Sequence, residues 1–294
     1  MTTFQLAGRH RQSGFDRRRL RKAGSRGGFS LLMTVFVVVS LFPFYWIVIT
    51  SLKSNAVLAQ GTTSLLPGHI TFSNYIDDFT QQDFLRPLLN SAIVCISATI
   101  LTVIIASMAG YALSRTKIKG RTAVMGFILV AGFFPILAMV GPLFIAYKHT
   151  GLLDTYPALI LSDLIYTLPL ATWLLASYFS QIPGELEEAA IVDGTTRLQA
   201  LRKVIIPVAL PGVFTAAILS FILAWNDFTF SLSFMTTPNM YTAPLAIVSL
   251  GQSPYQTFYN LIDAAVVIIS IPIAIIVILA QRRIVSGLTA GAVK

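Results

Sequence analysis

The sequence has few charged residues and few of the side chains that carry metal or redox chemistry. Among its 294 residues, 11% are charged, three are histidine and one is cysteine. The single cysteine, Cys95, excludes a disulfide framework and a cysteine-based zinc site within the chain. The histidines His10, His69 and His149 fall in expected tail or loop positions, with no second histidine at helical spacing. This pattern predicts that the chain binds no metal.

Motifs for nucleotide hydrolysis and nucleophilic catalysis are also absent. None of the seven lysines completes the Gly-x-x-x-x-Gly-Lys-Ser/Thr frame of a phosphate-binding loop. No Gly-x-Ser-x-Gly nucleophile elbow occurs either. We therefore expect no catalytic residue and no bound cofactor in this chain, so any energy that it uses must come from elsewhere.

Apolar residues make up 55% of the chain, more than the core of an ordinary soluble domain needs. Runs close to the roughly 20 residues that cross a bilayer predict an all-α membrane protein with six transmembrane helices. Prolines within these runs predict kinks or locally unwound turns. They are Pro43, Pro135, Pro142 and Pro169. The expected spans are 29–50, 88–113, 122–146, 157–180, 208–235 and 260–281, which together form a membrane domain over 29–281.

The basic residues indicate how the spans are oriented. Of the 21 Lys and Arg residues, 18 lie before the first span, in 114–121, in 185–207 or after the last span. Because cytoplasmic loops carry an excess of Lys and Arg, both termini and the 185–207 loop are predicted to be cytoplasmic. The net charge of +9 then follows from topology.

The predicted cytoplasmic tails comprise residues 1–28 and 282–294. The first contains the basic run Arg17–Lys22, which also suits nucleic-acid binding or a twin-arginine export signal. Its position directly before an apolar span favours a role in orientation and contact with anionic lipid instead. We therefore expect membrane lipid, and no nucleic acid, as its partner.

A polar segment over 182–207 predicts two short helices at the membrane surface. Pro183 opens the first helix, acidic residues fill its first turns, and Gly194 closes it in a left-handed conformation. Thr196 and Gln199 have the spacing of a capping box for the second helix. Pro207 marks the break before the next span. The apolar face of the second helix consists of Leu198, Leu201 and Ile205.

Polar residues inside the expected spans are candidates for a solute pathway, because hydrocarbon disfavours them unless they face a cavity or a partner. Asp163 lies near the start of the fourth span, where it is either solvated at the membrane boundary or available to bind hydroxyl groups. Asn226 and Asp227 in the fifth span suit hydrogen bonding to a polyhydroxylated ligand. The same pair also suits capping of a break in the span or bonding to a neighbouring helix.

The pattern in the polar loop resembles the EAA loop of ATP-binding-cassette importer permeases. It reads Glu188-Ala189-Ala190, then Gly194, then Val204-x-Ile206-Pro207. Further segments are similar to the carbohydrate branch of these permeases, and to the second, maltose-type subunit in particular. They are Leu66-Pro67, Thr71–Tyr75, Leu89–Ser91, Ala224–Phe228, Gln281–Arg283 and Gly287–Lys294.

The resemblance implies a type I importer permease fold, a location in a bacterial-type inner membrane, and a set of protein partners. These are a homologous second permease in a heterodimer, two ATPase subunits that use ATP and Mg, and an extracytoplasmic solute-binding protein that delivers a sugar. The residues implied to couple to the ATPase are Glu185, Glu188, Ala189, Ala190, Asp193, Gly194 and Arg197. A second implied ATPase contact comprises Gly287, Leu288, Thr289 and Lys294.

Two other functions stay open at this point. One is an ATP-driven permease for a solute that is not a sugar, such as an amino acid or phosphate. The other is a secondary transporter driven by an ion gradient, with Asp163 and Asp227 as coupling acids.

Overall fold

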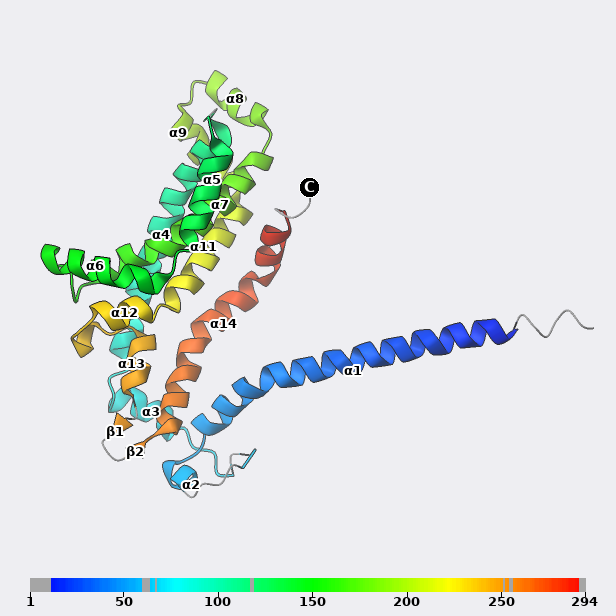
Figure 1. Ribbon diagram of the computed structural model, residues 1–294, viewed down its shortest axis with the longest axis vertical. Coiled ribbons are helices and arrows are strands. Elements are labelled where there is room, and N and C mark those ends of the chain that lie inside the picture. Colours follow the sequence, from blue (N-terminus) through cyan, green and yellow to red (C-terminus); the bar gives the residue numbers. More distant parts are fainter. Residues whose placement is uncertain are drawn as a thin grey trace, which may run out of the picture.

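The chain forms a bundle of helices in the computed structural model, which describes residues 12–59, 64–66, 68–116, 119–250, 252–253 and 256–290. For 12–27, 252–253, 256 and 282–290 it describes the backbone alone. The long helices are α1 (Gln12–Ser51), α4 (Leu85–Arg115), α7 (Tyr156–Gln181), α11 (Leu210–Trp225) and α14 (Tyr259–Ala290). Figure 1 shows α8 and α9 at one end of the bundle, and α3 with the two strands at the other. We call these the α8 end and the α3 end.

Shorter elements connect the long helices. The two strands pair antiparallel, with Gln252 opposite Thr257 and Ser253 opposite Gln256. The short helices are α2 (Asn55–Ala59), α3 (Ser73–Thr80), α5 (Arg121–Gly132), α6 (Ile136–Thr150), α8 (Gly184–Val192), α9 (Arg197–Ala200), the π-helical turn η1 (Leu201–Ile205), α10 (Ile206–Val208), α12 (Thr229–Phe234), the 3-10 turn η2 (Pro238–Met240) and α13 (Ala243–Ser249), and the strands are β1 (Gln252–Ser253) and β2 (Gln256–Thr257).

Four described helices are long and apolar enough to cross a membrane as single pieces: Gly28–Ser51, Leu85–Arg115, Tyr156–Gln181 and Tyr259–Gln281. Two further candidates are bent helix pairs. Helices α5 and α6 meet at 85°, and the pair Arg197–Val208 and Leu210–Trp225 meets at 86°. The described part of the chain therefore has the six expected spans only when each bent pair counts as one span.

The centre of the bundle is built from α4, α7 and α11, which pack side by side (Figure 1). Gly110 permits the closest approach between α4 and α7, since a Cβ atom there would lie 2.9 Å from the backbone nitrogen of Ala176. Helix α1 leaves this bundle and packs against α14 (Figure 1). Its apolar stretch is exposed along most of its length, as expected of a helix that lipid or another chain surrounds.

Buried amide groups fasten the α3 end. The Nδ2 atom of Asn74 donates to the carbonyl oxygens of Ser51 (2.7 Å) and Lys53 (2.9 Å). Asn260 Nδ2 donates in turn to Asn74 Oδ1 at 2.6 Å. These bonds join the end of α1, the start of α3 and the start of α14, so three segments far apart in sequence are held together.

Two of the predicted spans differ from the structure. The span expected over 208–235 ends at Trp225, because Asn226, Asp227 and Phe228 interrupt the helix before α12 begins. The span expected over 122–146 is broken near Pro135, which has extended backbone (ψ 115°) and lacks the N–H that a continuing helix needs. The predicted kink at Pro135 is thus confirmed. The helices continue past Pro43, Pro142 and Pro169.

Candidate functional site

The first helix of loop 182–207 forms where the sequence predicts it. Helix α8 follows Pro183, which serves as its N-cap, and carries acidic residues in its first turn, where the helix dipole favours negative charge. Gly194 has φ +87°, the left-handed conformation that glycine adopts at little cost. Its N–H donates to the carbonyl of Ile191 at 3.0 Å, and the N–H of Thr195 donates to that of Ala190 at 3.1 Å. This is the Schellman arrangement, so the predicted left-handed helix end is confirmed.

The second helix of the loop has the predicted capping box. Gln199 N–H donates to Thr196 Oγ1 at 3.3 Å, and Thr196 N–H donates to Gln199 Oε1 at 2.9 Å. The helix continues through η1 and α10, past Pro207, and the 86° bend falls at Ala209. The predicted break at Pro207 therefore lies two residues too early, because proline fits the first turn of the short helix α10.

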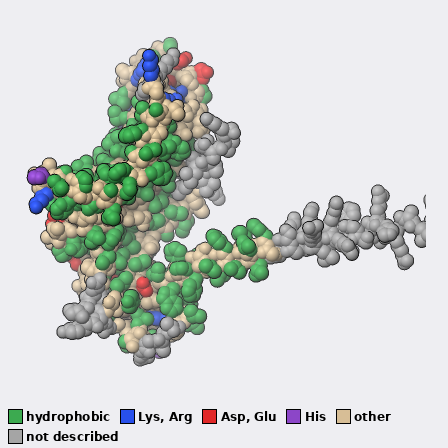
Figure 2. All heavy atoms as spheres, in the orientation of Figure 1, with side chains coloured by type: hydrophobic (Ala, Val, Ile, Leu, Met, Phe, Trp, Pro, Cys, Tyr) green, Lys and Arg blue, Asp and Glu red, His purple; other side chains and the backbone are tan. Residues whose placement is uncertain are grey.

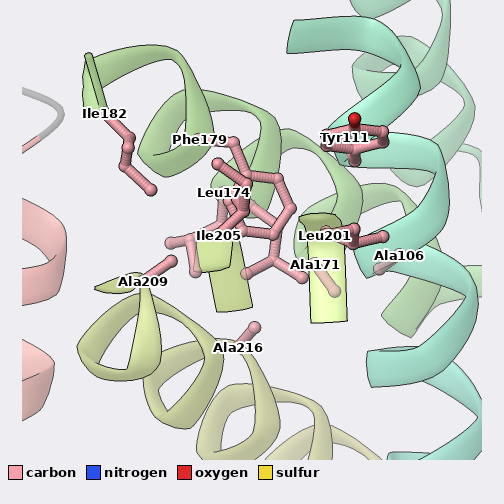
Figure 3. Packing of buried hydrophobic residues seen from close by; sticks show 11 residues of the cluster. Ala106, Tyr111, Ala171, Leu174, Phe179, Ile182, Leu201, Ile205, Ala209 and Ala216 are labelled. Carbon is pink, nitrogen blue, oxygen red and sulfur yellow. The ribbon is translucent and has the colours of Figure 1, made fainter. Parts of the chain in front are cut away.

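An apolar cluster anchors the loop to the bundle (Figure 3). Leu201 and Ile205 from η1 pack against Phe179 and Ile182 at the end of α7. All four side chains are buried, and fully burying one such side chain contributes about 2 kcal/mol. Leu198, which was expected to share an apolar face with Leu201 and Ile205, is 63% exposed and lies outside this cluster.

Most of the residues implied to couple to a partner lie on the surface of this loop. Ala190 differs from the others, because it is 8% exposed and packs inside the loop. Four large apolar side chains that the resemblance did not indicate are also exposed, and the most exposed of them are Val192 at 86% and Leu198 at 63%. Apolar residues beside the Asp193–Gly194 turn, outside any span, were the available signal for them. The exposed coupling residues are Glu185, Glu188, Ala189, Asp193, Gly194 and Arg197.

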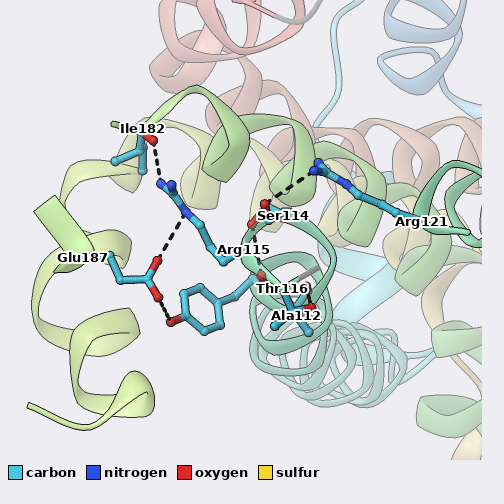
Figure 4. A network of polar contacts seen from close by, with 8 residues as sticks. Ala112, Ser114, Arg115, Thr116, Arg121, Ile182 and Glu187 are labelled. Carbon is cyan, nitrogen blue, oxygen red and sulfur yellow. Dashed lines mark hydrogen bonds and ion pairs between the residues drawn. The ribbon is translucent and has the colours of Figure 1, made fainter. Parts of the chain in front are cut away.

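A polar network on the inner side of α8 was not predicted (Figure 4). Tyr111 OH on α4 donates to Glu187 Oε1 at 2.5 Å. Arg115 Nε lies 3.6 Å from Glu187 Oε2, and Arg115 Nη2 donates to the carbonyl of Ile182 at 2.7 Å. Tyr111 and Glu187 are 76 residues apart, so no local spacing could have identified this network.

The candidate pathway acid Asp163 is buried inside the bundle. It is 1% exposed, which makes the solvated interpretation wrong. Tyr166 OH donates to its Oδ1 atom at 2.7 Å, while Oδ2 has no hydrogen-bond partner among the described residues. A buried carboxyl oxygen without a partner is costly and is therefore rare in a purely structural role.

Asn226 and Asp227 lie at the break after α11 and have different surroundings. Asp227 accepts the backbone N–H groups of Phe230 (3.2 Å) and Ser231 (3.1 Å), so it caps α12. This is the capping interpretation that the sequence left open. Asn226 is exposed, and its Nδ2 donates to the carbonyl of Ile222 at 2.7 Å within its own helix. Its side chain is thus accessible to a ligand or a second chain.

The expected C-terminal contact is described only in part. Gly287, Leu288 and Thr289 belong to α14, whose backbone is helical to Ala290, and Lys294 lies outside the described residues. Within the described ranges, no three His, Cys, Asp or Glu side chains gather where they could hold a metal ion.

Comparison with known proteins identifies the family. The model of the family "Binding-protein-dependent transport system inner membrane component" matches residues 102–289, a region that includes loop 182–207. The chain belongs to this family. It is therefore a permease, a multi-pass membrane component of an ATP-binding-cassette transport system.

Several relatives of this permease are similar over nearly the whole chain. The trehalose transport system permease protein SugB of Mycobacterium tuberculosis is 42% identical, over 90% of this chain and 97% of its own length. The trehalose/maltose transport system permease protein MalG of Thermococcus litoralis is 37% identical, over 88% of this chain and 94% of its own.

A solved structure has the same fold. It is a chain of a bacterial transporter involved in the import of the acidic polysaccharide alginate, and it matches with a TM-score of 0.76 at 26% identity. The match covers 90% of this chain and 97% of that chain. The predicted all-α importer permease fold is therefore confirmed at the level of the fold.

Proposed function

We propose that this permease is one membrane-spanning half of an ATP-driven importer for a di- or oligosaccharide, and that loop 182–207 receives the force from a separate ATPase. The observation that carries the proposal is the contrast between the two sides of the loop. Its inner side is anchored in the apolar cluster of Figure 3. Its outer side presents Glu188 with exposed apolar residues such as Val192. A surface of this kind suits a cleft on a partner protein.

The charge distribution supports a cytoplasmic position for this loop. Figure 2 shows Lys, Arg, Asp and Glu side chains gathered at the α8 end. The described basic residues Arg115, Lys119 and Arg121, together with those of 185–207, belong to this end, while the apolar surface between the two ends carries few charges. By the positive-inside rule, the α8 end and both chain termini face the cytoplasm of a bacterial-type cell.

The proposed complex contains other proteins that complete the membrane pathway, hydrolyse ATP and deliver the solute. A homologous second permease forms a heterodimer with this chain and covers part of its exposed apolar surface, and lipid covers the rest. Two ATPase subunits bind ATP and Mg and dock on the coupling residues and the C-terminal segment. A solute-binding protein delivers the ligand at the α3 end, in keeping with the description of the family.

The substrate class rests on the relatives. Their names specify trehalose, or trehalose and maltose, and the solved structure belongs to an alginate importer. We therefore propose a di- or oligosaccharide. Asn226 and Asp163 are the proposed pathway residues, because the first is accessible and the second has a carboxyl oxygen with no hydrogen-bond partner among the described residues. We assign Asp227 a supporting part through its cap on α12.

Reconstitution of the complete complex in vesicles tests this function. With the binding protein outside and ATP inside, we expect uptake of a radiolabelled disaccharide such as trehalose or maltose, together with substrate-stimulated ATP hydrolysis. Glu188→Lys should lower ATPase docking and uptake by about tenfold, because it reverses an exposed charge in the docking surface. Lys148→Glu reverses an exposed charge on α6 and should change neither.

The alternative functions predict different results. Uptake of an amino acid or phosphate in place of sugar would exclude the proposed substrate class. Uptake that continues without an ATPase, driven by an ion gradient, would exclude the ATP-driven mechanism and favour a secondary transporter. Normal ATP hydrolysis and uptake in Glu188→Lys would remove this residue from the docking surface.

A further inference from the structure

Glu187 and Arg115 connect three helices at the α8 end (Figure 4). The two carboxylate oxygens of Glu187 contact different groups of α4, the hydroxyl of Tyr111 and the guanidinium of Arg115. The same guanidinium donates to the carbonyl of Ile182, directly after α7. We call Tyr111, Arg115 and Glu187 the α4–α8 clamp.

The clamp is shielded from water, so each of its two charges needs the other to compensate for lost hydration. The side chains of Arg115 and Glu187 are 12% and 13% exposed. An ion pair at this depth is screened less than a surface pair, and removal of one partner leaves the other charge uncompensated. Helix dipoles hold both charges in place, since Glu187 lies in the first turn of α8 and Arg115 contacts a carbonyl just past the end of α7.

Glu187 faces away from the surface that we assign to the partner. Its neighbour Glu188 is exposed, and Val192 is the most exposed apolar residue of α8. Two adjacent acids of one helix thus point to different environments. A role for Glu187 in direct docking is inconsistent with this geometry, whereas a role in holding α8 to the bundle fits it.

The clamp leads to a closely packed part of the bundle, the α4–α7 pair. Directly beyond it, α4 and α7 approach so closely at Gly110 that an added Cβ would lie within 3.2 Å of backbone atoms of both Leu175 and Ala176. Along the chain, α8 is connected to α11 through α9, η1 and α10, a segment that contains a π turn and ends at the 86° bend. Irregular and bent segments transmit displacement less directly than packed helices do.

We propose that the α4–α8 clamp transmits the movement of α8 to the α4–α7 pair, with Glu187 as a positioning residue that couples ATP hydrolysis to transport. The inference rests on the proposed function. On this proposal, α4 and α7 move first when α8 moves. Helix α4 is distant from α8 along the chain, and α7 is joined to α8 by the short Ile182–Pro183 link. Helix α11, which follows α8 through η1 and α10, moves later. Without the clamp, only the Ile182–Pro183 link and the η1 contacts join α8 to the α4–α7 pair, so the pair follows α8 less closely.

The test is the number of solute molecules transported per ATP hydrolysed in the reconstituted complex. Glu187→Gln removes the charge with little change of shape. We expect the ATPase to stay bound and hydrolysis to stay within about twofold of the unaltered complex, while uptake per ATP falls by about tenfold. Tyr111→Phe removes one hydroxyl and should cause a smaller fall in the same ratio.

Two further variants separate coupling from folding. Arg121→Gln removes a cation whose long contact, 3.5 Å from Nη1 to the carbonyl of Ser114, lies outside the clamp, and it should leave the ratio unchanged. Glu187→Asp keeps the negative charge in the first turn of α8 and should lower the ratio less than Glu187→Gln does. If Glu187→Gln lowers the yield of complex, the ratio of uptake to hydrolysis is measured in Tyr111→Phe instead, and a fall in that ratio supports the proposal.

The outcomes that overturn the proposal are specific. An unchanged ratio of uptake to hydrolysis in both Glu187→Gln and Tyr111→Phe excludes transmission through the clamp. Loss of the ATPase from purified Glu187→Gln complex makes Glu187 a docking residue and also overturns it. A failure of the proposed function looks different, because then the unaltered chain itself shows neither bound ATPase nor ATP-driven uptake.

Discussion

The N–H of Thr195 donates to the carbonyl of Ala190 at 3.1 Å, and this bond closes α8 across the turn at Gly194. The hydroxyl of Thr195 donates to the same carbonyl at 2.6 Å. The direction in which the chain leaves α8 is therefore set by the left-handed backbone of Gly194 and by the Ala190 carbonyl, which accepts both bonds from Thr195. The exposed surface of loop 182–207 depends on this turn, since Asp193 and Arg197 lie on either side of it.

Substitution of Gly194 should impair docking through the backbone alone. No atom lies within 4 Å of a Cβ placed there, so the expected cost comes from φ +87°. A branched residue in the left-handed region costs about 1–2 kcal/mol, whereas asparagine tolerates it better. We expect Gly194→Val to lower ATPase co-purification clearly and Gly194→Asn to lower it little, with normal membrane insertion of both. Equal docking by the two variants would show that this turn does not position the loop.

Gly110 should not tolerate a side chain because of close packing, whereas the cost at Gly194 comes from backbone conformation. A Cβ atom there would lie 2.9 Å from Ala176 N, and backbone atoms in a packed helix pair cannot move aside easily. Gly110→Ala should therefore destabilise the protein by about 1–3 kcal/mol. Gly126→Ala on α5 is the matched control, because nothing lies within 4 Å of its added Cβ, and alanine there should stabilise the helix by up to about 1 kcal/mol. The thermal midpoint of the purified complex measures both, and a midpoint lower for Gly126→Ala than for Gly110→Ala would contradict the packing argument.

Substitutions of Asn226 and Asp227, at the break of the fifth span, should have different effects: Asp227 should matter for stability and Asn226 for uptake. Asp227→Ala removes the cap of α12 and should destabilise that helix by about 1 kcal/mol, while Asp227→Asn keeps one acceptor. Hydrogen exchange at the amides of Phe230 and Ser231 measures this effect. Asn226→Ala changes an exposed side chain, so stability should change by no more than about 0.5 kcal/mol while uptake falls. Uptake equal to that of the unaltered protein would remove Asn226 from the pathway.

The packing of α3 should depend on pH through Asp78. This side chain is fully buried, neither carboxyl oxygen has a hydrogen-bond partner among the described residues, and burial together with the neighbouring Asp77 raises its pKa from 3.8 to about 7. The folded state therefore holds a proton that the unfolded state loses first. Its stabilising effect is complete below pH 3.8, decreases as the pH rises to about 7, and is lost above that.

Hydrogen exchange of α3, corrected for intrinsic rates, checks this dependence. Exchange should be faster at pH 8 than at pH 5, and Asp78→Asn should remove the difference because its side chain does not titrate. Asp77→Asn should retain the difference with a midpoint at lower pH, since one source of the raised pKa is lost. An unchanged pH dependence in Asp78→Asn would assign the effect to another group.

Local features of this permease follow closely from the sequence. The cap at Gly194 and the capping box of Thr196 and Gln199 involve residues no more than five positions apart, so the hydrogen bonds that form them are set by local chain geometry. The long apolar helices were predictable because hydrocarbon requires every backbone group to be bonded within its own segment. Leu198 shows the limit of this reasoning, since it has helical spacing to the buried Leu201 and Ile205 and is nevertheless 63% exposed.

The sequence by itself determined the number of apolar segments, the position of the polar loop and the capping of its two helices. Only the tertiary structure decided that Asp163 is buried, that Asp227 caps a break after α11, and that Glu187 reaches across to Tyr111 and Arg115. The physical reason is the range of the interactions. Backbone hydrogen bonds and burial in lipid act on short stretches of chain, whereas the environment of a buried charge depends on which distant helices the fold brings beside it.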